Sequence, residues 1–145
     1  MLLLLFACAT STPTPVTTPA PTVAKSAATP DPVGPDGPSD IPVPEVTALS
    51  TASADIQSGH EVWEARGCGG CHKFGAKLVG PDLAGVTTRR TLPWIERMIT
   101  DPEAMTKRDP AAKELFRSIM VQMPKQGVTS EELPQLLAYI HAQGG

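Results

Sequence analysis

Two cysteines and a histidine set the strongest constraint on what this chain can fold into. Cys68 and Cys71 are separated by two glycines, and His72 follows at once. This spacing is the attachment signature for a c-type haem, because two thiols one tight turn apart can bond to the two vinyl groups on one porphyrin edge. Gly69 and Gly70 carry no Cβ, so the backbone between the thiols can turn tightly. The motif therefore predicts one covalent haem c, held by both cysteines and ligated by His72.

A zinc site and a thiol redox site are the alternatives for the same residues. A structural zinc ion normally takes four ligands, often as two spaced pairs, and the only other cysteine is Cys8. His60 and His141 could supply nitrogens, but neither has the spacing of a zinc motif. A redox Cys-x-x-Cys is expected beside a βαβ pattern, and no strand pattern flanks this one. The sequence thus favours haem over both alternatives.

Composition divides the chain at about residue 50. Ten of the 16 prolines lie in residues 9–50, with many Thr, Ala and Ser and without an aromatic residue. Such a segment cannot bury enough apolar surface to offset its chain entropy, so we expect a disordered Pro/Thr-rich linker there. Residues 51–145 remain for the folded domain. That length is marginal for a core made of side chains alone, and a covalent haem would enlarge the core.

The charge pattern excludes two classes of partner. In residues 51–145 five Lys and six Arg balance eleven Asp and Glu, so the net charge of −3 comes from the first fifty residues. No basic face points to nucleic acid, and no polybasic stretch would hold an anionic membrane surface. The sequence also lacks a phosphate-binding glycine loop and a paired-carboxylate arrangement, so no small-molecule substrate is expected.

The first eight residues have the character of a targeting element. Residues 1–6 are apolar, and the run from Leu5 to Cys8 resembles a bacterial lipobox, at which a signal peptide is cleaved and the cysteine lipidated. We expect residues 1–8 to be part of a signal peptide and Cys8 to be a lipid anchor. The alternative is an ordinary signal peptide with an incidental cysteine. Both place the domain outside the cytoplasm, in the periplasm or on the outer face of the cell membrane.

The domain is expected to be all-α, because strand patterns are absent and four segments repeat apolar residues at helical spacing. Each segment starts at a residue whose side chain can cap free backbone N–H groups. Loops should cover residues 73–86 and 121–127. The expected helices are residues 54–66 after Ser53, residues 92–100 after Thr91, residues 110–120 after Asp109, and a last helix opened by the capping box of Thr129 and Glu132.

The sequence resembles the small class I (mono-haem) bacterial cytochromes c, in a lipoprotein form, over nearly all of residues 53–145. The family fold, which the resemblance implies here, wraps helices around one covalent haem. It also implies that the first and last helices cross, with a glycine and an aromatic residue on one meeting an aliphatic and an aromatic residue on the other. The resemblance is carried by Gly59 and Trp63, the Cys-Gly-Gly-Cys-His motif, the segment from Val79 to Leu83, Met123 with Pro124, and Leu136 with Tyr139.

The resemblance also implies roles around the haem. The carbonyl of Pro81 is implied to accept a hydrogen bond from the Nδ1–H of His72, which fixes the tautomer of the imidazole. Trp94, Arg89 and Arg90 follow the Gly-Pro-Asp-Leu segment and are the candidates for contacts to the haem propionates, since buried carboxylates need donors or opposite charge. The alternative is that Trp94 fills the core and that the arginines are solvated.

Four methionines follow the haem motif and could supply the sixth iron ligand. Met123 is the expected one, because it stands in irregular chain before Pro124, which favours an extended backbone at the preceding residue. A position shortly before the last helix is also where the family places this ligand. Met98 is expected to pack in the core, Met105 to be exposed and Met120 to continue the third helix.

A haem with His72 and Met123 as axial ligands implies an electron carrier that cycles between Fe(III) and Fe(II) and transforms no substrate. Its partners would be redox proteins of the membrane or periplasm, which dock transiently through small interfaces. Two alternatives remain open. One is a five-coordinate haem enzyme, which needs an iron that no methionine reaches. The other is a small-ligand sensor or structural module.

Overall fold

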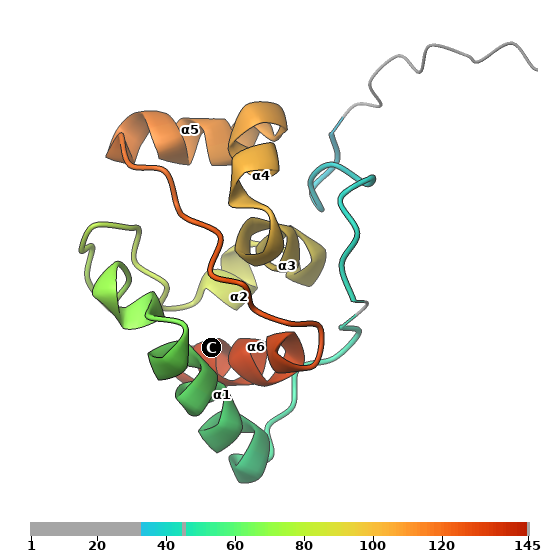
Figure 1. The fold of residues 1–145 in the computed structure, drawn as a ribbon, viewed down its shortest axis with the longest axis vertical. Helices are drawn as coiled ribbons and strands as arrows, with labels where there is room; N and C mark the ends of the chain where they lie inside the picture. Colours follow the sequence, from blue (N-terminus) through green and yellow to red (C-terminus); the bar gives the residue numbers. More distant parts are fainter. Residues whose placement is uncertain (1–32, 45, 145) are drawn as a thin grey trace, which may run out of the picture.

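The computed structural model describes residues 33–44 and 46–144, and the regular secondary structure within them is helical. The expectations for residues 1–8, with the anchor Cys8, and for the linker up to residue 32 lie outside these described residues. No helix in the described part is long and apolar enough to cross a membrane. The elements, shown in Figure 1, are α1 (Ser53–Ala65), the 3₁₀ turn η1 (Cys68–Gly70), α2 (Val86–Arg89), α3 (Leu92–Thr100), α4 (Pro102–Arg108), α5 (Pro110–Ile119) and α6 (Glu132–Ala142).

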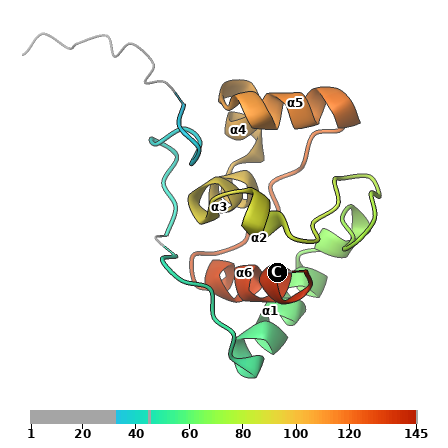
Figure 2. The same ribbon diagram turned by 180° about the vertical axis from the view of Figure 1, so that it is seen from behind.

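Helices α1 and α6 lie against each other in both views of the ribbon (Figures 1 and 2). A Cβ on Gly59 would lie 2.0 Å from the backbone oxygen of Gln135 and 2.8 Å from the Cβ of Tyr139. Trp63, one turn further along α1, is buried, and its ring centroid lies 5.7 Å from that of Tyr139. The close approach explains a glycine in mid-helix despite its cost in helix propensity. The expected packing of the first helix on the last is confirmed.

Capping side chains stand at the expected places at the starts of α3 and α5 and shortly before α6. Thr91 Oγ1 accepts the backbone N–H three residues on at 3.4 Å, and α3 covers the predicted residues. Asp109 Oδ1 accepts the backbone N–H of Ala112, in the first turn of α5, at 2.8 Å. The N–H of Thr129 donates to Glu132 Oε2 at 2.8 Å, and the N–H of Glu132 donates to Thr129 Oγ1 at 3.3 Å. This reciprocal pair is the predicted capping box.

Helices α2 and α4 were not expected from the sequence, and α1 starts at Ser53 rather than after it. Asp101 ends α3 as predicted, but its side chain at once caps α4 by accepting the N–H of Ala104 at 3.0 Å. Pro102 occupies the first position of α4, where its missing N–H costs nothing. Met105 of this helix is 0% exposed, so the expectation that it is exposed is wrong.

Residues 35–44, here called the N-terminal strap, pack onto α3 and α4. Ile41 of the strap is buried. The Arg97 guanidinium donates to the carbonyl oxygens of Ile41 at 3.1 Å and Asp36 at 2.6 Å. Part of the segment that composition predicts to be linker therefore packs against the helices, while the boundary at residue 50 stays a prediction. The sequence of the strap does not reveal this packing, because one buried isoleucine and two accepting carbonyls leave no periodic pattern in a proline-rich segment.

Candidate functional site

The haem motif forms a tight turn directly after α1. The backbone N–H groups of Cys71 and His72 both donate to the carbonyl oxygen of Cys68, at 3.2 and 3.0 Å. One turn therefore carries both thiols and the imidazole. A Cβ on Gly69 would lie 3.0 Å from Nε1 of Trp63, so glycine at this position lets the turn pack closely onto α1.

The imidazole of His72 is held by the segment that follows the motif. Its Nδ1 lies 3.0 Å from the carbonyl oxygen of Pro81. A carbonyl can only accept, so Nδ1 carries the proton and Nε2 is the nitrogen suited to bind a metal ion. A Cβ on Gly80 would lie 2.5 Å from Cε1 of the imidazole, so the segment lies against the ring only because this residue is glycine. The structure thus contains the hydrogen bond that the resemblance implies.

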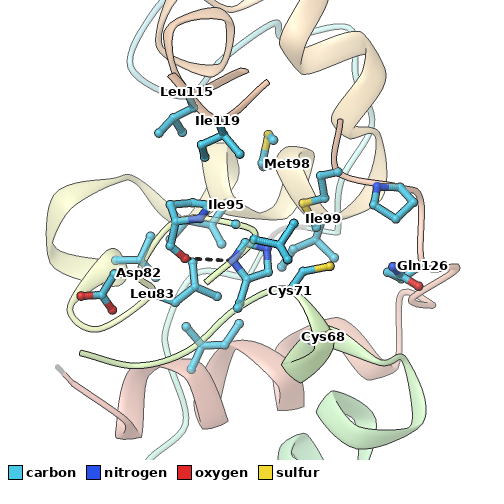
Figure 3. A pocket seen from close by; sticks show the side chains of 18 of the residues that line it. Cys68, Cys71, Asp82, Leu83, Ile95, Met98, Ile99, Leu115, Ile119 and Gln126 are labelled. Atoms are coloured by element: carbon cyan, nitrogen blue, oxygen red, sulfur yellow. Dashed lines mark hydrogen bonds between the residues drawn. The ribbon is translucent and has the colours of Figure 1, made fainter. Parts of the chain in front are cut away.

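A largely apolar cavity lies above this turn (Figure 3). Cys68, Cys71 and His72 all line it, so the three groups of the motif face one space. Helices from distant parts of the sequence supply its walls. The apolar wall residues include Ile95 and Ile99 of α3, Leu115 and Ile119 of α5, and Leu136 and Ile140 of α6.

The chemistry of these groups fits haem c and neither alternative. Cys68 and Cys71 form no disulfide with each other, and burial raises the pKa of the Cys68 thiol. A redox cysteine needs the opposite shift, toward the thiolate. Among the residues that the structure describes, no group of three or more His, Cys, Asp or Glu side chains could hold a metal ion. Two thiols, one metal-binding nitrogen and apolar walls are what a covalent haem requires.

Two of the methionines beyond the motif line the cavity. They are Met123, in the irregular segment between α5 and α6, and Met98 on α3. Met120 is 75% exposed and has a left-handed φ of 59°, and it does not line the cavity. Met105 is buried elsewhere. The structure therefore brings Met123 to the same cavity as His72 and leaves Met120 outside it, while the ligand role of Met123 stays a prediction.

The three residues expected at the propionates also line the cavity. The side chain of Trp94 has a single N–H, which donates to Asp109 Oδ1 at 3.0 Å, so the structure gives the indole a partner other than a propionate. Arg89 donates to the carbonyl oxygen of Asp82 at 3.1 Å. The guanidinium carbon of Arg90 lies 4.9 Å from the centroid of the Trp94 ring. Propionate contacts by these three residues stay predictions.

Asp82 is a residue of the site to which the sequence assigned no role. Its Oδ1 accepts the backbone N–H groups of Ala84 and Gly75, both at 2.8 Å. These hydrogen bonds, that of Ala84 first, lower the pKa of the Asp82 carboxyl. They tie together the loop that runs from His72 to α2. A signal was present, since aspartate in a turn commonly accepts the backbone N–H two residues on.

Comparisons with known proteins agree with this geometry. The family model for cytochrome c matches residues 56–143. No curated protein matches the chain. Cytochrome c from Rhodothermus marinus has 26% sequence identity and a TM-score of 0.65, with 70% of this chain and 87% of that chain covered. An engineered form of that protein bound to a carbene intermediate has 26% identity and a TM-score of 0.61, with 70% and 88% covered.

Fold and site together define an all-α protein that binds one covalent haem c. The chain belongs to the cytochrome c family, and it has the fold of the class I, mono-haem members. Haem-based electron transfer is the general activity of that family.

Proposed function

We propose that this cytochrome is an electron carrier in which His72 and Met123 are the axial ligands of the iron. The observation that carries the proposal is the cavity, because it is lined by an imidazole with Nε2 available and by a thioether from a distant segment. Haem c, when bound, supplies a one-electron Fe(III)/Fe(II) couple, in which a thioether ligand favours the reduced state.

The chain's own residues orient the ligands and exclude water. Pro81 fixes the tautomer and the direction of the His72 ring through its carbonyl oxygen. Ile95 and Ile99 present apolar side chains to the cavity from a helix that is capped by Thr91. A rigid apolar wall keeps the surroundings of the site nearly unchanged when its charge changes, which suits fast electron transfer.

The proposed partners are redox proteins that dock transiently at the rim of the cavity. Val79, Phe116 and Val121 line the cavity and are 44%, 37% and 51% exposed. An apolar rim of this size suits a small, short-lived interface. The sequence segments 71–81 and 117–126 contain no acidic residue, so a partner with acidic residues around an apolar centre is complementary. The cations of these segments are Lys73, Lys77, Arg117 and Lys125.

The proposed location is the periplasm or the outer face of the cell membrane, with Cys8 as a lipid anchor. The support is the lipobox-like run before Cys8 and the extracytoplasmic location usual for class I cytochromes c. Cys8→Ser should move the cytochrome from the membrane fraction into the soluble fraction. A wild-type protein that is already soluble would remove the anchor.

The ligand pair is tested by NMR of the reduced, haem-loaded protein with ¹³C-labelled methionine methyl groups. One methyl resonance should be shifted strongly upfield by the porphyrin ring current. Met123→Leu should remove the signal at this chemical shift, whereas Met120→Leu, the same change at an exposed position, should leave it. Loss of the resonance in Met120→Leu instead would reassign the ligand. A wild type with no shifted methyl would favour the five-coordinate enzyme or sensor.

A further inference from the structure

The cavity is lined by a second thioether in addition to that of Met123. Met98 lies on α3 and lines the cavity together with Ile95 and Ile99, which are three residues before it and one after it (Figure 3). These positions share one helix face. The helix is capped by the side chain of Thr91 at its start and ends with an N–H donated by Asp101. The backbone that carries Met98 is therefore fixed.

The backbone that carries Met123 is held less firmly. In the part of the chain that the structure describes, no backbone N–H of residues 121–128 donates to a backbone carbonyl. Side-chain links are few: Thr106 donates to Gln122 Oε1 at 2.9 Å, and the Gln122 amide donates to the carbonyl of Met123 at 3.2 Å. Segments with so few hydrogen bonds open at a low free-energy cost. The two thioethers thus differ in how easily they leave the cavity.

We propose that Met98 is an alternative sixth ligand, which binds the iron when the segment carrying Met123 moves away. This inference rests on the proposed function, in which Met123 is the resident ligand. In the exchange the Fe–S bond to Met123 breaks and an Fe–S bond to Met98 forms. Both ligands are neutral thioethers, so no proton or electron is transferred. The unbranched methionine side chain, with three rotatable bonds, allows the sulfur to move while the helix stays in place.

The function of such a pair is to keep the iron closed to small ligands. When the Met123 segment opens, a five-coordinate iron would bind carbon monoxide or cyanide and would lose its suitability for electron transfer. Met98 fills that position from a rigid helix. The carrier therefore tolerates motion of its ligand loop, which lies next to the docking rim at Val121.

Three variants of the haem-loaded protein test the exchange. They are Met123→Ala alone, and Met123→Ala combined with either Met98→Leu or Met120→Leu. Leucine nearly conserves the volume of methionine, so packing is preserved. The single variant and the Met120 double variant should keep the iron–thioether charge-transfer band of the oxidised state. The Met98 double variant should lose the band and bind carbon monoxide about tenfold more tightly, because a competing ligand has been removed.

Two results would overturn the inference: equal spectra and carbon monoxide affinities in the single and the Met98 double variants, or band loss in the Met120 double variant instead. A second measurement needs no change at Met123. Exchange NMR on the labelled wild type should connect the shifted Met123 methyl with an unshifted signal of the same methyl, and the Met98 methyl with a shifted signal of its own. Met98→Leu should abolish the second of these exchanges. A shifted Met123 methyl without exchange of the Met98 methyl would contradict only the present inference. A wild type without any iron–thioether signal would also contradict the proposed function.

Discussion

The indole N–H of Trp94 donates to Asp109 Oδ1 at 3.0 Å, and the same oxygen accepts the backbone N–H of Ala112 at 2.8 Å. Trp94 and Asp109 are 5% and 3% exposed. One buried carboxylate oxygen therefore joins α3, which forms a wall of the cavity, to the first turn of α5. Removal of the indole donor would leave a buried carboxylate short of a hydrogen bond, which costs more than an ordinary hydrogen bond contributes.

Trp94→Phe should therefore lower the free energy of unfolding by about 1–3 kcal/mol. It should not change how the reduction potential depends on pH, because the N–H that is lost donates to Asp109 rather than to a propionate. Denaturant unfolding and potentiometric titration of the haem-loaded protein measure the two effects. A changed pH dependence of the potential would support the propionate contact that the sequence predicts for Trp94.

Gly59→Ala tests the contact between α1 and α6. The new Cβ would lie 2.0 Å from the backbone oxygen of Gln135, and a backbone atom cannot move aside as a side-chain end can. We expect a loss of about 3 kcal/mol in the free energy of unfolding. Gly34→Ala is the matched control, since a Cβ there meets no atom within 4 Å. If both variants unfold at the same denaturant concentration, the close approach does not stabilise the fold.

The features that could be predicted from the sequence are local. The caps at Thr91 and Asp109 and the capping box at Thr129 each depend on residues within one helical turn, so a short stretch of sequence specifies them. The turn that carries the haem motif is likewise formed by residues that are adjacent in the sequence. Gly59 and Tyr139 lie far apart in the sequence, and their contact was predictable only because the family resemblance implies it.

The features that could not be predicted depend on distant partners. Helix α4 has seven residues, a length at which a helix is marginal by itself, and it is stabilised by the cap at Asp101 and by burial of Met105. The partner of Trp94 lies 15 residues away, at the N-cap of α5, and no spacing rule connects the two. The strap carries one buried isoleucine in a proline-rich segment, which composition alone classes as linker.

Ile41→Ala tests whether the strap stabilises the domain. Ile41 is 6% exposed, so truncation leaves a cavity and should lower the free energy of unfolding by about 2–4 kcal/mol. Asp40→Asn is the control, because its ion pair with Arg108 is exposed and should contribute little. Denaturant unfolding distinguishes the two. A disordered strap would make Ile41→Ala as mild as Asp40→Asn.

Glu96 should make the stability of the domain depend on pH. This residue of α3 is 0% exposed, its Oε1 accepts the N–H of Val46 at 3.3 Å, and its Oε2 has no partner among the described residues. Burial raises the pKa of the Glu96 carboxyl, against the smaller opposite effects of the Val46 hydrogen bond and the charge of Arg97. The folded state therefore holds this proton to a higher pH than the unfolded state does.

The sign of the effect follows from this difference in proton binding. The stabilisation from Glu96 is complete below the pKa of the unfolded chain and is lost as the pH rises through the higher pKa of the folded state. Glu96→Gln keeps an acceptor for Val46 and cannot ionise. It should equal the wild type in stability at low pH and exceed it increasingly as the pH rises. Glu103→Gln, the same change at an exposed position of α4, is the matched control in denaturant unfolding over a pH series. Parallel pH curves for the wild type and Glu96→Gln would mean that the folded state stabilises the Glu96 carboxylate as well as water does.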